Sequence, residues 1–216
     1  MKPFVHLNCA MTVDGKIATK NSSLKISGAN DLIRVHELRK KYDAIMVGIN
    51  TVLIDNPRLT VHKVDSDRND NPIRIIIDSK AKTPPDSRIL NDEADTIIFV
   101  SNIADKHRKS LLSKKCNVIT CGEKLVDLKK AMNILYDYGI ESLLLEGGST
   151  LNFSMLNEKL VDKVSICVGS IILGGRNSKT FVDGDGFSID EILKLELIDV
   201  KKIDEDVLLT YLTKYS

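Results

Sequence analysis

The feature of this sequence that most restricts its fold is a series of short apolar runs separated by helical patterns. Six runs occupy positions 4–9, 44–47, 73–77, 96–100, 117–120 and 142–145. They show little polar alternation, which is typical of strands covered on both faces. Between two of them, Leu125, Leu128, Met132 and Leu135 follow helical spacing. The series therefore predicts an α/β fold with a mainly parallel central sheet and helices on both faces.

The C-terminal part follows a different pattern. Strand-like segments at 163–168, 195–202 and 207–213 have no long helical pattern between them. The last two are joined by residues 203–206 (IDED), which predicts an antiparallel C-terminal hairpin. A chain of 216 residues suits one large α/β domain, so we expect a single domain over residues 1–216.

Composition excludes several classes of function. Lys and Arg number 31 against 30 Asp and Glu, so we expect no bulk attraction to nucleic acid or to an anionic membrane. The sequence has neither a signal-peptide pattern nor an apolar stretch long enough to span a bilayer, which predicts a cytoplasmic protein. The four cysteines and four histidines match no common metal-ligand spacing, so no metal is predicted.

The sharpest local signal is residues 143–151 (LLLEGGSTL), an apolar strand that runs through Glu146 into Gly147 and Gly148. Ser149 and Thr150 then open a helix. Glycines let the backbone approach a ligand, and the amides of a helix N-terminus favour an anion. The segment therefore indicates a pyrophosphate-binding turn, or else a tight strand-to-helix turn with Ser149 as N-cap. Glu146 either faces solvent or binds the polar edge of a ligand.

Three other polar segments have simple local interpretations. Asp14, Gly15 and Lys16 predict a hairpin turn. Residues 48–60 (GINTVLIDNPRLT) follow an apolar strand and form a polar loop, and residues 65–71 (DSDRNDN) predict a solvent-exposed loop.

Five segments together resemble the motifs of one enzyme family. These segments are residues 10–18 (AMTVDGKIA), 35–39 (VHELR), 43–60 (DAIMVGINTVLIDNPRLT), 74–78 (RIIID) and 143–151 (LLLEGGSTL). In this order they resemble the reductase family of riboflavin biosynthesis, relatives of the bacterial bifunctional deaminase–reductase. The resemblance implies a dihydrofolate-reductase-like fold, a homodimer, and NADPH as hydride donor with NADH as an alternative. The chain has no zinc-deaminase motif, so it resembles the stand-alone archaeal or fungal type.

For that type, the implied reaction reduces the ribosylamino side chain of 2,5-diamino-6-ribosylamino-4(3H)-pyrimidinone 5′-phosphate to the ribitylamino product. By matching position, the resemblance assigns cofactor binding to Thr51, Asp55, Ser79, Lys80, Ala81, Lys82, Gly147, Gly148, Ser149 and Thr150. It assigns substrate binding to Ser23, Arg39, Leu59, His62 and Glu146. No catalytic residue is assigned, although Glu146 and Asp14 are candidates for a proton donor.

Two alternative functions fit the same sequence. One is a reductase on this scaffold that acts on a pterin or dihydrofolate. The other is a nucleotide-binding module without catalytic activity, which would bind NADPH but not turn it over. The sequence alone favours the riboflavin-pathway reductase over both.

Overall fold

The computed structural model describes residues 1–19, 22 and 24–215. The chain divides into two compact units. Unit 1 comprises Met1–Phe4 and His36–Leu144, and unit 2 comprises Val5–Val35 and Leu145–Ser216. Helix α1 (Ala29–Lys41) and strand β7 (Ser142–Gly147) each contribute residues to both units.

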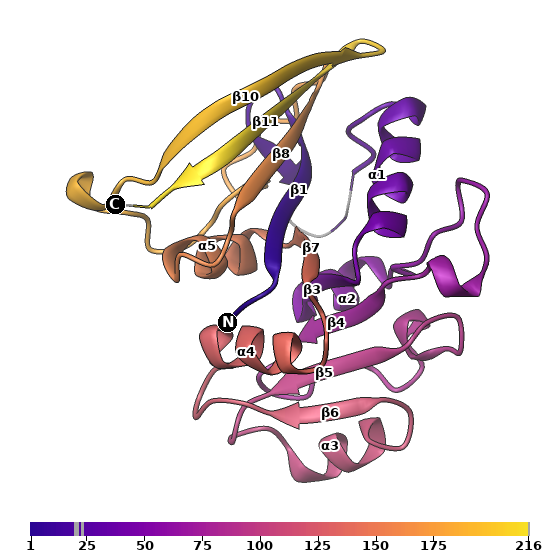
Figure 1. Cartoon of the computed structure of the whole chain (residues 1–216). Coiled ribbons are helices and arrows are strands. Elements are labelled where there is room, and N and C mark those ends of the chain that lie inside the picture. Colours follow the sequence, from indigo (N-terminus) through magenta and orange to yellow (C-terminus); the bar gives the residue numbers. More distant parts are fainter. Residues whose placement is uncertain (20–21, 23, 216) are drawn as a thin grey trace. The chain divides into compact units, whose positions relative to one another are not determined.

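Unit 1 is a parallel α/β unit with the strand order β7-β3-β4-β5-β6. Its other strands are β3 (Ala44–Gly48), β4 (Ile73–Ile77), β5 (Thr96–Val100) and β6 (Asn117–Thr120), and β3 to β6 pair in parallel (Figure 1). Its helices are α2 (Ile49–Asp55), α3 (Lys106–Leu112) and α4 (Leu128–Asp137), with short 3-10 turns at Arg68–Asp70 and Arg88–Leu90. The predicted parallel strands are confirmed.

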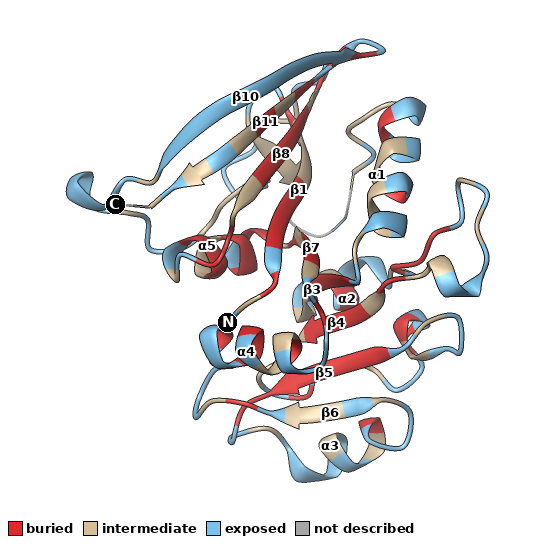
Figure 2. Ribbon diagram, viewed as in Figure 1, coloured by how far each residue is buried: buried red, intermediate tan, exposed pale blue. Residues whose placement is uncertain are grey.

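The strands β3, β4 and β5 of unit 1 are apolar because they are covered on both faces. Every residue of β5 is buried, and Figure 2 shows this strand and most of β4 in red. A charged side chain also lies inside this sheet: Arg74 is fully buried on β4. Its guanidinium donates to the Asn91 side chain at 3.0 Å and to the main-chain oxygen of Arg88 at 3.2 Å. These acceptors replace part of the water that burial removes, and Arg74 Nε is left buried without a hydrogen-bond partner among the described residues.

Unit 2 contains the predicted C-terminal hairpin, with the strand order β10-β11-β8-β1-β7. Strand β1 (Phe4–Thr12) pairs in parallel with β8 (Lys163–Gly169). Strands β10 (Lys194–Ile203) and β11 (Asp206–Lys214) pair with each other in antiparallel fashion, and β11 also pairs with β8 (Figure 1). Helix α5 (Ser149–Asn157) and a 3-10 turn at Ile189–Glu191 complete the unit.

The turn at Asp14 to Lys16 is confirmed, but the predicted hairpin is wrong. The Gly15 amide donates to the Thr12 carbonyl at 2.9 Å, and Gly15 has a φ of +76°. Strand β2 (Lys16–Ala18), however, pairs with β9 (Lys179–Thr180) and not with β1. The partner is distant in sequence, so the local turn signal could not identify it.

A buried polar contact links β1 to β8 within unit 2. His6 Nε2 lies 2.7 Å from Ser165 Oγ, and the His6 side chain is almost fully buried. Burial, aided by the positive charges of Lys163 and Arg34, lowers the pKa of His6 to about 3. His6 is therefore neutral in the folded protein at physiological pH.

No helix within the described ranges is both long and apolar enough to cross a membrane.

The neutral His6 predicts a specific dependence of stability on pH. An unfolded histidine binds a proton below about pH 6.5, whereas folded His6 binds one only near pH 3. The free energy of unfolding should therefore fall as the pH drops from 6.5 towards 3, by at most about 1.4 kcal/mol per pH unit from this residue. Urea unfolding of the wild type and of His6→Gln at several pH values measures the difference in slope.

The matched control is His107→Gln, which changes an exposed histidine at the start of α3. We expect the control to keep the wild-type slope and His6→Gln to flatten it. Parallel curves for the wild type and His6→Gln would contradict the assignment.

Candidate functional site

Residues 146–148 (Glu-Gly-Gly), here called the EGG turn, join β7 to α5. Both glycines have left-handed φ values. Gly147 has a φ of +78° and Gly148 a φ of +76°. Gly148 is the N-cap of α5, and its carbonyl accepts the first helical hydrogen bond, from Asn152 N at 2.9 Å. The alternative with Ser149 as N-cap is therefore wrong. Because Gly148 has no side chain, it supplies no cap to the first-turn amides, and such amides can bind an anion.

Gly147 is also required by the packing of α5 itself. A Cβ at this position would lie 2.3 Å from Oδ1 of Asn152. Asn152 is almost fully buried, and its Nδ2 donates to the Phe181 carbonyl at 2.9 Å. The first glycine therefore makes room for an asparagine of the following helix, a role that the sequence analysis missed.

The two residues that open α5 differ in their surroundings. Thr150 is exposed, whereas Ser149 is buried. Burial acts to raise the pKa of the Asp183 carboxyl group. Hydrogen bonds from Thr180 and from Ser149 outweigh this effect, so the pKa of Asp183 is lowered. The Ser149 hydroxyl thus already has an ionised partner, so an anion at this helix end would bind main-chain amides and Thr150.

Glu146 is half-buried on β7, just before the glycines. Its charge acts on Cys9 of β1: burial first, and then the carboxylates of Glu146 and Asp31, raise the pKa of the Cys9 thiol to about 12. Cys9 is therefore an uncharged thiol, and Glu146 supplies a carboxylate directly before the two glycines.

Asp14, in contrast, is held as an acceptor. Its Oδ1 accepts from Thr12 Oγ1 at 2.6 Å, and its Oδ2 accepts from the Gly174 amide at 2.7 Å. The Thr12 hydroxyl, followed by the Leu173 amide, lowers the pKa of Asp14 to about 2. These contacts hold the Asp14 carboxylate as a hydrogen-bond acceptor, which argues against the hypothesis that Asp14 is a proton donor.

In unit 1 the structure brings together two of the predicted substrate residues. Arg39 Nη1 donates to the Thr60 carbonyl at 3.1 Å, and His62 Nδ1 lies 3.1 Å from the same oxygen. The His62 amide donates to His36 Nδ1 at 3.1 Å, and the two imidazole rings meet edge to face with centroids 4.3 Å apart. Arg39 and His36 lie three residues apart, on one face of α1.

Both histidines of this cluster have a lowered pKa. Burial, aided first by the charge of Arg39, lowers the pKa of His36 to about 4. Burial also lowers the pKa of His62; the Thr60 carbonyl opposes this shift, whereas Arg39, Arg58 and Lys63 add to it. His36 can therefore accept the His62 amide proton, because its Nδ1 is unprotonated.

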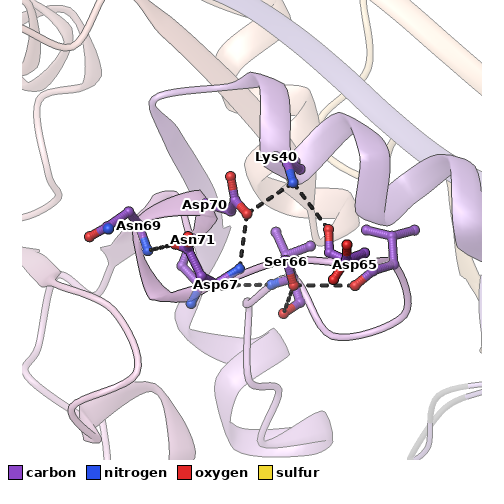
Figure 3. A network of polar contacts seen from close by, with 9 residues as sticks. Lys40, Asp65, Ser66, Asp67, Asn69, Asp70 and Asn71 are labelled. Carbon is purple, nitrogen blue, oxygen red and sulfur yellow. Dashed lines mark hydrogen bonds and ion pairs between the residues drawn. The ribbon is translucent and has the colours of Figure 1, made fainter.

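The segment that follows His62 is exposed, as predicted, but it is fixed by polar contacts (Figure 3). Lys40 Nζ lies 2.9 Å from Asp70 Oδ2 and donates to the Asp65 carbonyl at 3.0 Å. Asp67 and Asp70 form a reciprocal capping box. Asn71 Oδ1 then accepts the Val61 amide at 2.7 Å, which ties this segment to the residue before His62.

Other predicted residues contribute in different ways. Leu59 has a φ of 55° and a side chain only 2% exposed, so any contact with a substrate would come from its main chain. Thr51 and Asp55 lie on α2 four residues apart, hence on one face, and Asp55 is exposed. Ser23 lies outside the described residues.

The predicted 2′-phosphate segment is a structured loop after β4. Ser79 Oγ accepts the Val126 amide at 3.0 Å. Lys80 and Lys82 are exposed, whereas the side chain of Ala81 is fully buried between them. The predicted cofactor residues therefore fall on both units: Thr51, Asp55 and residues 79–82 in unit 1, and residues 147–150 in unit 2.

Within the described part of the chain, no group of three or more His, Cys, Asp or Glu side chains is arranged to hold a metal ion.

Comparison with known proteins gives consistent matches over nearly the whole chain. The model of the family described as "RibD C-terminal domain" matches residues 3–209. The 2,5-diamino-6-ribosylamino-4(3H)-pyrimidinone 5′-phosphate reductase of Methanothermobacter thermautotrophicus is 53% identical over 99% of this chain and 100% of its own length. The protein of the same name from Archaeoglobus fulgidus is 38% identical over 97% of this chain and 98% of its own. Acinetobacter baumannii RibD superposes with a TM-score of 0.83 and 25% identity, over 99% of this chain and 58% of that one.

The packing of Gly147 predicts that its substitution costs more than backbone strain alone. Gly147→Ala would add a left-handed alanine, at about 1–2 kcal/mol, and a contact with Asn152 that the structure must relieve. Gly139→Ala is the matched control, because Gly139 has a φ of +84° but no heavy atom within 4 Å of the added Cβ. Urea unfolding should show a larger loss for Gly147→Ala.

A second substitution tests the named contact. Asn152→Ala should recover part of the stability lost by Gly147→Ala, so that the double variant is more stable than the sum of the single effects implies. Equal losses for the two glycine variants, or additive effects in the double variant, would show that Asn152 is not the constraint.

Proposed function

The chain belongs to the RibD C-terminal domain family, and we propose that it catalyses the NADPH-dependent reduction of 2,5-diamino-6-ribosylamino-4(3H)-pyrimidinone 5′-phosphate. The family makes it a reductase of riboflavin biosynthesis. The observation that carries the choice of substrate is the 53% identity to the M. thermautotrophicus reductase over the full length of both chains. We treat residues 1–216 as one reductase domain, which the match over residues 3–209 supports.

The residues present fit a nicotinamide dinucleotide, which this family of reductases implies. The N-cap of α5 is a glycine, so a diphosphate can approach the first-turn amides without meeting a Cβ. The exposed Lys80 and Lys82 supply positive charge for an adenosine 2′-phosphate, which supports NADPH over NADH.

The cluster of Arg39 and His62 fits the 5′-phosphate of the substrate. Arg39 donates through Nη1 to the Thr60 carbonyl, and the planar fork of a guanidinium suits a phosphate. Glu146 supplies a carboxylate that can accept hydrogen bonds from the amino groups of a pyrimidine or from ribose hydroxyls.

A reduced nicotinamide supplies a hydride when it is bound. The ribosylamine of the substrate opens to an imine, the former anomeric carbon gains the hydride, and the nitrogen gains a proton to give the ribitylamine. This chain aligns the reactants and excludes water. We assign the proton to neither of the two candidate side chains, because Asp14 is held as a hydrogen-bond acceptor and Glu146 is assigned to the substrate as a carboxylate.

The reaction is tested by following the near-ultraviolet absorbance of NADPH with the purified protein. We expect the absorbance to fall with the ribosylamino-pyrimidine phosphate and not with dihydrofolate. Glu146→Gln should impair turnover much more than it weakens NADPH binding, since the carboxylate is assigned to the substrate. Consumption with dihydrofolate alone would favour the alternative reductase, and NADPH binding without turnover of either substrate would favour a non-catalytic module.

We also propose that the protein is a cytoplasmic homodimer formed through one face of the β10–β11 hairpin. Leu197 pairs with Tyr211 and Val200 with Leu209, and paired side chains lie on the same face of an antiparallel ladder. Leu197 and Val200 are 53% and 56% exposed. Strand β10 ends the strand order, with β11 as its one neighbour. An apolar patch on an edge strand favours association, and a second copy of this chain offers a surface of the same kind.

The dimer predicts a change of mass in solution. Leu197→Lys combined with Val200→Lys should convert the dimer to a monomer in sedimentation or light-scattering measurements, because charges would be buried in the interface. Ile103→Lys, which changes a residue of unit 1 that is 54% exposed, is the control and should stay dimeric. A wild type that sediments as a monomer, or a double variant that stays dimeric, would refute this interface.

A further inference from the structure

The loop after β4 is closed by a buried carboxylate. Asp78 Oδ2 accepts hydrogen bonds from the amide of Thr83 at 2.7 Å and from its hydroxyl at 2.8 Å. The Asp78 carbonyl also accepts the Ala81 amide at 3.0 Å. Asp78 and Thr83 are both buried, so the two ends of the loop are fixed in the protein interior.

The middle of this loop has an unusual backbone conformation. Ala81 has a φ of 53°, which costs an alanine about 1–2 kcal/mol. Its methyl group is fully buried in the core of unit 1 with Ile76, Ile98 and Leu112. The methyl group therefore anchors the loop to this core. The left-handed conformation of Ala81 changes the direction of the chain between Lys80 and Lys82.

Arg108 of helix α3 stabilises this conformation through two hydrogen bonds to the loop backbone. Its Nε donates to the Ala81 carbonyl at 2.7 Å, and its Nη2 donates to the Lys82 carbonyl at 2.8 Å. Asp105 caps the helix by accepting the Arg108 amide at 2.8 Å, so the arginine starts from a fixed backbone position. A guanidinium suits this task, because its fork presents two parallel donors to two neighbouring acceptors.

We propose that Arg108 is a positioning residue that sets the selectivity of this protein for a dinucleotide carrying a 2′-phosphate. It holds the carbonyls of Ala81 and Lys82 so that the exposed Lys80 and Lys82 stand on either side of a fixed turn. Two ammonium groups held at a constant spacing bind a phosphate better than two that move freely, because less conformational entropy is lost on binding. This inference rests on the proposed NADPH-dependent function.

Arg108 acts through the lysines in this proposal. Two of its nitrogen atoms already donate to main-chain carbonyls at short distances, and these bonds keep the guanidinium beside the loop backbone. The phosphate is assigned to Lys80 and Lys82. A double-mutant cycle separates this positioning role from direct contact between Arg108 and the phosphate.

The test uses calorimetric titration of the purified full chain with two small probes, 2′,5′-ADP and 5′-AMP, which differ by the 2′-phosphate. The wild type should bind 2′,5′-ADP more tightly, and Arg108→Met should reduce this preference by about tenfold, the value of one charge-assisted contact. Arg108→Lys keeps the charge but loses the fork, so it should show an intermediate preference. Lys106→Met removes a charge from an exposed position two residues earlier on α3 and should keep the wild-type preference.

The cycle adds Lys80→Met and Lys82→Met together. In that background Arg108→Met should cause no further loss of preference for 2′,5′-ADP. A further loss of the same size would show that Arg108 contacts the phosphate itself and would overturn the positioning role. A wild type without preference for 2′,5′-ADP would also overturn the inference. The turnover assay with NADPH and NADH tests the reductase activity independently of this result.

Discussion

The central strands of unit 1 are filled mainly by apolar side chains, so polar side chains gather where these strands begin and end. A polar group that is buried without a partner costs about 1–3 kcal/mol, so each polar side chain at a strand end must find a partner nearby. Asp78 finds the amide and hydroxyl of Thr83 at the end of β4, and Asp43 accepts the Ser142 amide at 2.8 Å before β3. These contacts fix the segments before β3 and after β4, and the second of these segments carries Lys80 and Lys82.

The strands could be predicted closely because their signal is local. The expected strands at residues 73–77, 96–100 and 117–120 have the bounds observed for β4, β5 and β6. Pairing between distant segments could not be predicted in the same way. The turn at Gly15 was identified, yet β2 pairs with Lys179–Thr180, which no feature of residues 14–18 indicates. The prediction of the hairpin of β10 and β11 is confirmed, and it could be made because its two strands are neighbours in sequence.

The candidate site could be predicted from motifs as a set of positions, but the reason for each residue required the structure. Gly147 was attributed to a ligand, whereas Asn152 of the protein itself occupies the space beside it. Leu59 and Ala81 have buried side chains and positive φ values, so their contribution comes from the main chain. The supporting residue His36 lies in the VHELR motif and could have been suspected, since it shares a helix face with Arg39. Arg108 gave no such signal, because its contacts with the loop are 26 and 27 residues distant in sequence.

In the proposed phosphate site, the electrostatics of the Arg39 cluster would allow a histidine to serve beside an arginine. The chain as a whole carries a formal charge of only +1, so any attraction for a phosphate must come from local crowding of cations. Arg39, Arg58 and Lys63 all act to lower the pKa of His62. A phosphate dianion placed among them would offset the same repulsion and would favour the imidazolium form. An arginine is charged in every state, whereas His62 would gain its charge under this proposal when an anion is bound, and this would avoid the cost of one more cation in the ligand-free cluster.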